Sequence, residues 1–154
     1  MEALAAAIIW LVPQIPQHRA ESYAELIAEH SAKHEIDPLL VTAITYRESR
    51  FAPHTASKGN YGLMQVRVTP KRRPRWVGRE REVMEPVRNI RMGVAELAMW
   101  RSYHRRECGV RNPHPWWSHY QHGGRVRNLR SAVRIGRVYS ALKARFRTEG
   151  VPQS

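Results

Sequence analysis

Apolar residues recur at helical spacing along most of this 154-residue sequence, and patterns typical of β-strands are nearly absent. The spacing predicts helices over residues 20–33, from Pro38 to about residue 48, over residues 86–100 and over residues 127–145. A chain of this length is large enough to bury the apolar faces of these helices in one core. The sequence therefore predicts a mostly α protein with one principal domain.

The helix that begins at Pro38 carries a carboxyl group on its apolar face. Asp37 suits the capping position of this helix, and a proline suits its first turn. Leu40, Ile44 and Glu48 then follow at intervals of four residues, so Glu48 lies on the apolar side. Partial burial and the negative end of the helix dipole both disfavour a charged carboxylate there, and we expect the pKa of Glu48 to be raised. Glu48 is thus a candidate general acid, and an ion pair with a neighbouring arginine is the alternative.

Two turn-rich segments are candidates for the remainder of a site. Residues 51–66 contain a proline, two glycines and a glutamine, and residues 112–126 contain two prolines, two tryptophans and a Gly-Gly pair. Trp116 and Trp117 are suited either to stacking on sugar rings or bases, or to packing in the core. Residues 68–81 are strongly basic and predict an exposed loop, which either follows an anionic ligand or is simply solvated.

The charge and the cysteine content restrict the partners and the kind of metal site. The chain has 26 Lys and Arg against 13 Asp and Glu, a formal net charge of +13. This excess indicates nucleic acid, an anionic membrane or an anionic wall polymer, and a solvated basic surface is the alternative. A single cysteine, Cys108, excludes an internal disulfide framework and a Cys-rich zinc site, and we expect a buried or half-buried thiol. His30 and His34 are four residues apart but have no obvious third ligand, so we expect no metal and no cofactor.

The segments around Glu48 resemble a known family. ESRFAPHTAS, beginning at Glu48, and GLMQ, beginning at Gly62, are similar to the soluble lytic transglycosylase domain of lysozyme-like enzymes that cleave peptidoglycan. Two further segments, MEPVRNIRMGVAEL and HYQHGGRV, also resemble this family. The matching residues in the four segments include Glu48, Ser49, Phe51, Pro53, Ser57, Gly62, Leu63, Met64, Gln65, Pro86, Asn89, Ile90, Gly93, Leu97, Tyr120 and Gly123.

The resemblance implies a fold and a set of site residues. It implies a lysozyme-like helical domain, with a cleft between the Glu48 helix and the segments 57–65 and 116–123. It identifies Glu48 as the catalytic residue. Gln121 stands where the family has asparagine, and Met64 is expected on the cleft floor. The residues that it implies for substrate binding are Ser57, Met64, Gln65, Tyr120 and Gln121.

The resemblance also implies a mechanism, in which Glu48 acts first as acid and then as base on the bond between N-acetylmuramic acid and N-acetylglucosamine. The product would carry a 1,6-anhydro end, without a second catalytic carboxylate. Goose-type lysozymes, which hydrolyse the same bond with water, are the nearest alternative. Alternatives of other classes are a basic nucleic-acid-binding module and a glycan-binding domain without activity. The expected partners are peptidoglycan strands and an envelope or secretion assembly, and the expected location is periplasmic or extracellular.

The resemblance and the composition together suggest three parts of the chain. Residues 20–146 are expected to form the catalytic domain, and residues 147–154 a tail. In residues 1–19, the apolar stretch 3–12 is too short to span a bilayer. It has the length of the apolar region of a signal peptide, although Glu2 stands where basic residues are expected. A first helix packed on the domain, or the remnant of a longer precursor, is the alternative.

Overall fold

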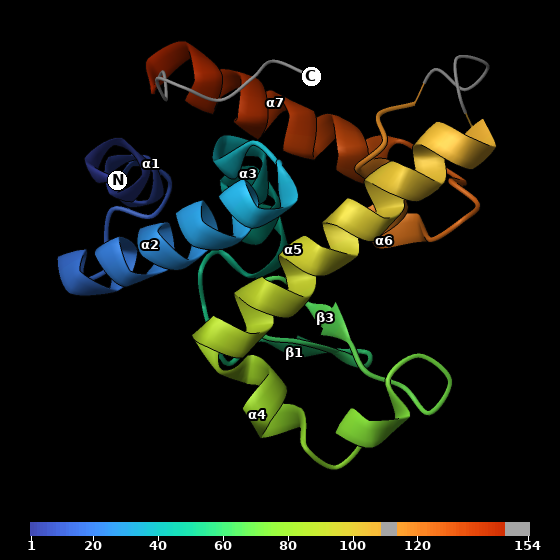
Figure 1. The fold of residues 1–154 in the computed structure, drawn as a ribbon. Coiled ribbons are helices and arrows are strands. Elements are labelled where there is room, and N and C mark those ends of the chain that lie inside the picture. Colours follow the sequence, from blue (N-terminus) through green and yellow to red (C-terminus); the bar gives the residue numbers. More distant parts are fainter. Residues whose placement is uncertain (109–113, 147–154) are drawn as a thin grey trace.

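The computed structural model describes residues 1–108 and 114–146, and most of these residues are helical. The longer helices are α1 (Glu2–Leu11), α2 (Gln17–His34), α3 (Pro38–Ser49), α5 (Pro86–Tyr103) and α7 (Arg130–Arg145). Figure 1 shows α5 running diagonally through the middle of the molecule, with α1, α2 and α3 to one side of it. The predicted mostly α architecture is confirmed. The tail 147–154 and residues 112 and 113 of the second turn-rich segment lie outside the described residues.

Short elements connect the long helices. Three strands and two short helical turns lie between α3 and α5, and a π-helical turn and a short α-helix follow α5. These elements are β1 (Ala56–Ser57), β2 (Asn60–Tyr61), β3 (Val66–Arg67), η1 (Pro74–Trp76), α4 (Glu80–Met84), η2 (His104–Cys108) and α6 (Ser118–His122).

The first three helices form one part of the core. The apolar N-terminal segment is α1, which packs against α2 and α3 through buried Leu4 and Ile8. The predicted start of α3 is confirmed, because the Asp37 Oδ1 atom accepts a hydrogen bond of 2.8 Å from the Leu39 backbone N–H. Among the described residues, no helix has the length and apolar character that crossing a membrane requires.

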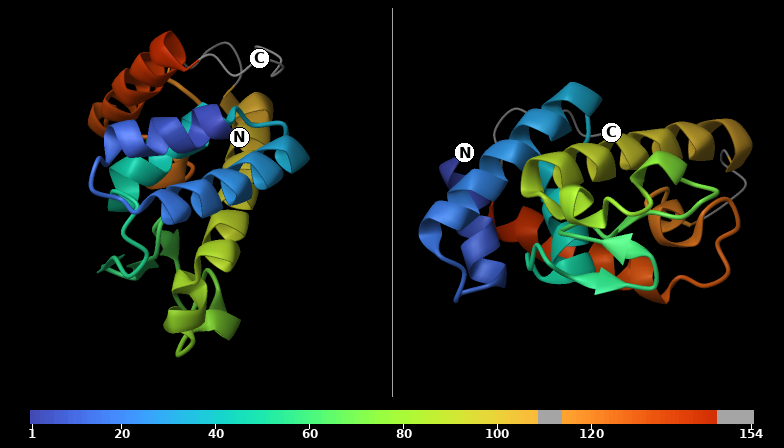
Figure 2. Two further views of the ribbon diagram at one scale, coloured as in Figure 1. Left: turned by 90° about the vertical axis from the view of Figure 1, so that its left-hand side faces the viewer. Right: turned by 90° about the horizontal axis from the view of Figure 1, so that it is seen from below.

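A small antiparallel sheet, from Ala56 to Arg67, lies mostly within the segment 51–66 that was predicted to be turn-rich. Its strand order is β1-β2-β3, and Tyr61 of β2 pairs with Ala56 on one side and Val66 on the other. Each strand has two residues, which is too short to produce the alternating pattern by which a strand is recognised. The views in Figures 1 and 2 show α3 lying between this sheet and α7, so the end of α3 is close to the sheet.

Asn89 of α5 holds the sheet in position. Its fully buried side chain donates hydrogen bonds of 2.8 Å to the carbonyl oxygens of Tyr61 and Val83, and it accepts one of 2.8 Å from the Met64 backbone N–H. Gly62 lies directly against this amide: a Cβ atom at Gly62 would be 2.2 Å from the Asn89 Nδ2 atom, and the φ angle of Gly62 is +78°. Glycine is therefore required at this point of contact.

Candidate active site

The backbone that follows Glu48 is tightly constrained. Helix α3 ends at Ser49, and the next two residues, Arg50 and Phe51, have φ angles of 54° and 61°. Non-glycine residues in this left-handed region cost about 1–2 kcal/mol each and persist only where the surroundings hold them. The Ser49 hydroxyl donates a hydrogen bond of 2.7 Å to the Leu63 carbonyl oxygen, and Phe51 is buried. These contacts fix the end of α3 against the turn that precedes β3.

Glu48 is half-buried and has a polar partner on another element. The Gln121 Nε2 atom on α6 donates a hydrogen bond of 2.6 Å to the Glu48 Oε1 atom. Burial raises the pKa of Glu48 above its ordinary value, while the hydrogen bond from Gln121 and the positive charge of Arg47 act in the opposite direction. The raised pKa predicted from the sequence is confirmed. Within the described residues Glu48 forms no ion pair with a neighbouring arginine.

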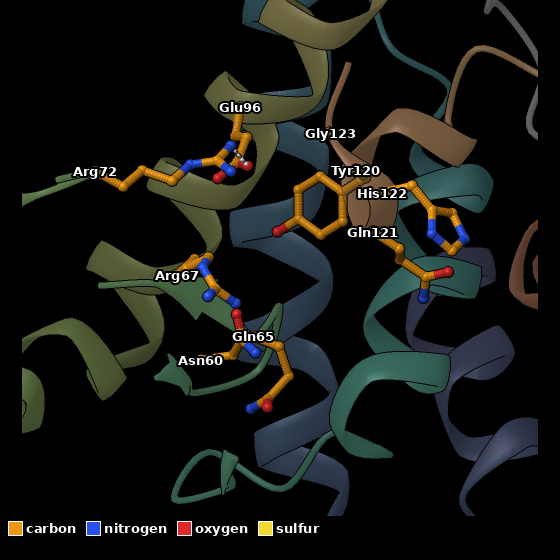
Figure 3. A pocket seen from close by; sticks show the side chains of 9 residues that line it. All are labelled: Asn60, Gln65, Arg67, Arg72, Glu96, Tyr120, Gln121, His122 and Gly123. Carbon is orange, nitrogen blue, oxygen red and sulfur yellow. Dashed lines mark hydrogen bonds and ion pairs between the residues drawn. The ribbon is translucent and has the colours of Figure 1, made fainter. Parts of the chain in front are cut away.

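A pocket of about 260 Å³ opens beside this pair. Figure 3 shows Tyr120 and Gln121 on one side of it and the β-sheet residues on the other. Gln121 lines the pocket and donates to Glu48, which is not itself among the lining residues, so Glu48 lies one hydrogen bond away from the pocket wall. The lining residues are Asn60, Gln65, Arg67, Arg72, Glu96, Tyr120, Gln121, His122 and Gly123.

Tyr120 connects α6 to the turn before β3. Its hydroxyl donates a hydrogen bond of 2.8 Å to the Met64 carbonyl oxygen. Burial, together with the negative charges of Glu96 and Glu48, raises the pKa of Tyr120 well above its ordinary value, so the hydroxyl remains a donor. Tyr120 therefore lines the predicted cleft and also positions α6.

The prediction that Met64 forms the floor of the cleft is wrong for its side chain. Met64 is 0% exposed. Its side chain packs against Gly93 of α5, where a Cβ atom would come within 2.5 Å of the Met64 Sδ atom. The Met64 side chain belongs to the core, and only its backbone carbonyl contributes to the site. In the sequence, an apolar residue beside a glycine-containing turn looks the same whether its side chain lines a cleft or packs in the core.

Gln65 and Ser57 are near the pocket, with different surroundings. The Gln65 Nε2 atom donates hydrogen bonds of 3.0 and 2.9 Å to the carbonyl oxygens of Thr55 and Gly62, which ties the turn together. Figure 3 shows the Gln65 amide pointing away from Tyr120. Ser57 is exposed on β1 and is not among the residues that line the pocket. Substrate binding by these two side chains stays a prediction.

The site region also contains a buried carboxylate with two arginine partners that was not predicted from the sequence. Glu96 of α5 is 7% exposed and forms ion pairs with Arg72 and with Arg73, the latter at 2.8 Å between the Arg73 Nη2 and Glu96 Oε2 atoms. Both arginines belong to the basic segment 68–81, which is therefore anchored at this point. The signal available in the sequence was the position of Glu96 directly before Leu97 of the apolar stripe of α5. Its partners, 23 and 24 residues away, could not be identified without the fold.

Trp116 and Trp117 pack rather than border the pocket. The Trp117 Nε1 atom donates a hydrogen bond of 3.5 Å to the Ala132 carbonyl oxygen on α7. The Trp117 ring lies 6.2 Å from the Tyr139 ring, centroid to centroid, in an edge-on arrangement. Of the two predicted uses of these tryptophans, packing describes what the structure shows.

The structure brings together a set of metal-ligating side chains other than the histidine pair considered from the sequence. Within the described residues, His30 and His34 belong to no group of three or more metal-ligating side chains. One other group meets this condition, and it consists of His104, Cys108, His114 and His119. These residues are spread over 16 positions at irregular spacing, with two on η2, one on α6 and one in the segment before α6, so no motif in the sequence indicates them.

Comparison with known proteins agrees with this geometry. The sequence model of the transglycosylase SLT domain matches residues 25–110, a range that includes Glu48 and ends before Tyr120 and Gln121. Two curated relatives are both called endo-type membrane-bound lytic murein transglycosylase A. The one from Klebsiella pneumoniae (strain 342) is 36% identical over 95 residues, 56% of this chain and 47% of the relative. The one from Salmonella paratyphi B is 35% identical over 94 residues, 56% of this chain and 46% of the relative. The chain thus spans about half the length of these relatives.

Proposed function

We propose, since the chain belongs to the transglycosylase SLT domain family, that it cleaves peptidoglycan as a lytic transglycosylase in the cell envelope. The family match and the helical architecture confirm the predicted lysozyme-like, mostly α fold. The observation that carries the proposal is the position of Glu48, half-buried with a raised pKa and hydrogen-bonded to Gln121, which lines an open polar pocket. A carboxyl group with a raised pKa keeps its proton to higher pH than an ordinary glutamate does, which suits it to act as a general acid.

The proposed reaction uses this one carboxyl group twice. Protonated Glu48 donates its proton to the glycosidic oxygen, and the bond between that oxygen and C1 of the N-acetylmuramic acid breaks. The acetamido oxygen of the same sugar bonds to C1 and neutralises the developing positive charge. The Glu48 carboxylate then takes the proton of the 6-hydroxyl, the O6 atom bonds to C1, and the bond from the acetamido oxygen breaks. Glu48 ends protonated, and no water is consumed.

The carboxylate that lines the pocket, Glu96, is already bound by other side chains, which supports a scheme with Glu48 as the one catalytic acid. Glu96 lies between Arg72 and Arg73, and the Trp100 Nε1 atom also donates to its Oε1 atom at 3.3 Å. Both oxygens of this carboxylate are occupied by guanidinium or indole donors, so it is poorly suited to act as a nucleophile or base. Most glycosidases require two free carboxyl groups, whereas of Glu48 and Glu96 only Glu48 forms no ion pair with the described residues.

The charge of the pocket also fits a wall polymer. Arg67 and Arg72 line it together with the single acid Glu96, and the whole chain carries +13. Peptidoglycan stems carry free carboxylates, which such a surface attracts. An envelope or secretion assembly is the corresponding partner that we expect for a chain with this activity.

The proposal is tested by digesting purified peptidoglycan and identifying the muropeptides by mass spectrometry. We expect products with 1,6-anhydro ends, which are lighter by one water than the products of hydrolysis. Products with reducing ends would instead assign the chain to the hydrolysing, goose-type chemistry. A chain that cleaves nothing and binds DNA, with an affinity that falls steeply with salt, would be a nucleic-acid-binding module. Retention on the glycan without any product would identify a non-catalytic binding domain.

The pH dependence of cleavage is expected to report the hydrogen bond between Gln121 and Glu48. This bond lowers the pKa of Glu48 from the value that burial alone would give. Gln121→Ala removes it, so the pKa should rise and Glu48 should keep its proton to higher pH. Because cleavage needs the protonated form, the alkaline limb of the rate profile should move to higher pH, as measured by initial rates of release of soluble muropeptides.

Gln17→Ala is the matched control for this prediction. The Gln17 Nε2 atom also donates to a glutamate, Glu21, at 2.8 Å, but on the exposed surface of α2. Its substitution should leave the profile unchanged. An alkaline limb that stays in place or moves to lower pH in Gln121→Ala would contradict the assignment of this limb to Glu48.

A further inference from the structure

Four metal-ligating side chains from η2, α6 and the segment before α6 converge at one point. The proposed cleavage does not use these residues. His104 and Cys108 lie on the π-helical turn η2, His119 lies on α6, and His114 lies in the segment before it. One ligating atom from each of the four residues lies within 4.8 Å of all the others. His119 is 0% exposed and forms the centre of the group.

The three distances from the His119 Nε2 atom match those between the ligands of a tetrahedral metal site. The His119 Nε2 atom is 3.1 Å from the His104 Nδ1 atom, 3.2 Å from the His114 Nε2 atom and 3.6 Å from the Cys108 Sγ atom. Ligands at usual zinc–nitrogen and zinc–sulfur bond lengths, arranged tetrahedrally, lie about 3.3 Å apart for two nitrogens and about 3.6 Å apart for nitrogen and sulfur. All three measured separations are within about 0.2 Å of these values.

One hydrogen bond at the His119 Nε2 atom does not account for its three close neighbours. The His119 Nδ1 atom is 2.8 Å from the Gly123 carbonyl oxygen, and because a carbonyl only accepts, this nitrogen carries the proton. The His119 Nε2 atom of a neutral ring then offers one lone pair, toward which two nitrogens and a sulfur all point. A cation at the centre satisfies all four ligands at once. A histidine ligand whose other nitrogen donates to a backbone carbonyl is the usual arrangement at metal sites.

We propose that His104, Cys108, His114 and His119 bind one Zn²⁺ ion. Three imidazoles and one thiolate favour zinc over magnesium or calcium, which prefer oxygen ligands. The protein supplies all four ligands, which is typical of a structural site rather than a catalytic one. Two aromatic rings pack on the central ligand: the Trp100 ring stacks on His119 at 5.6 Å and the Tyr103 ring meets it edge-on at 5.3 Å, centroid to centroid.

The ion would join α6 to the end of α5. Helix α6 has five residues, too few to be stable alone. His119 of α6 points into the ligand group, while the next two residues, Tyr120 and Gln121, line the pocket. A zinc ion that holds His119 against η2 would therefore also keep Gln121 beside Glu48. The binding itself does not depend on the proposed function, and it is measured without peptidoglycan.

The test is the zinc content and the zinc-dependent melting temperature of the full chain. The protein is stripped with a chelator, supplied with Zn²⁺ alone, and analysed by elemental mass spectrometry and by competition with a chromophoric chelator. We expect about one zinc per chain, and a higher Tm with zinc than without, because an ion that binds the folded state stabilises it. His104→Ala and Cys108→Ser should each weaken the affinity at least about 100-fold, more than the loss of a supporting residue, and should abolish the zinc-dependent rise in Tm.

The variants are chosen to separate binding from folding. His104 and Cys108 are only partly buried, so their substitutions are easier to tolerate than one at His119. His18→Ala/His54→Ala, which removes two exposed histidines elsewhere, is the matched control and should behave as the wild type. Replacing zinc by Co²⁺ should give a thiolate-to-cobalt absorption band that Cys108→Ser removes. Zinc retained equally by the ligand variants, or no binding by the wild type, would overturn the proposal.

Discussion

Glu48→Gln is expected to reduce the rate of peptidoglycan cleavage by about 10²–10⁴-fold, the usual contribution of a general acid or base, and by more if both proton transfers fail together. Glutamine has nearly the same shape and can still accept the hydrogen bond from Gln121, so the pocket should be preserved. It cannot donate a proton to the glycosidic oxygen. The measurement is the initial rate of release of anhydro-ended muropeptides by wild type and variant at equal concentration.

The same variant is expected to be more stable than the wild type at neutral pH. Because the folded-state pKa of Glu48 is raised, the protonated carboxyl favours folding below the unfolded-state pKa, and this advantage is lost as the pH rises through the folded-state pKa. Glutamine has no proton to lose. The Tm difference should be near zero in acid and grow toward pH 7, with roughly 2–4 °C for each kcal/mol in a chain of this size.

Glu25→Gln is the control for both measurements, since Glu25 is exposed on α2, away from the pocket. It should cleave at the wild-type rate and show no growing Tm difference. A Glu48→Gln variant that cleaves at the normal rate would show that Glu48 is not the acid. A variant that neither cleaves nor gains stability would indicate that Glu48 is less desolvated than its surroundings suggest.

Asn89→Ala is expected to be the most destabilising single substitution in the sheet region, with a loss of about 3–5 kcal/mol in the free energy of unfolding. It leaves the carbonyl oxygens of Tyr61 and Val83 and the N–H of Met64 without their partner in the core. Each unsatisfied buried group costs about 1–3 kcal/mol. The loss is a large fraction of the 5–15 kcal/mol that is typical for a whole domain.

Urea denaturation, followed by circular dichroism, checks this expectation. Asn128→Ala is the matched control: Asn128 is exposed and makes one long hydrogen bond of 3.3 Å, from the Arg130 N–H to its Oδ1 atom, so its loss should change the stability by less than about 0.5 kcal/mol. A loss at Asn89 no larger than at Asn128 would mean that water or a local shift satisfies the three groups.

Local patterns were sufficient where the structure depends on neighbours in the sequence. Asp37 and Pro38 start α3 as predicted, and the spacing of Leu40 and Ile44 placed Glu48 on the partly buried face. The raised pKa of Glu48 follows from that placement and needs no distant partner. The two-residue strands could not be predicted, because they are defined by pairing across turns rather than by an alternating pattern.

Contacts between distant segments decided the rest of the site. The Met64 side chain is in the core because Gly93 of α5 leaves space for it, and nothing near Met64 in the sequence indicates this. Glu96 of α5 forms ion pairs with two arginines of the basic segment 68–81. Gln121, 73 positions from Glu48, is its hydrogen-bond donor.

The sequence by itself determined the helical architecture, the family and the position of the acidic residue, because helix periodicity, capping and a contiguous motif are all local. Only the tertiary structure decided which groups surround that acid and that one cysteine and three histidines meet at a single point. Hydrogen bonds and metal ligation act over about 2–4 Å. At that range the partners depend on how helices and turns pack, and packing is not encoded at any fixed spacing along the chain.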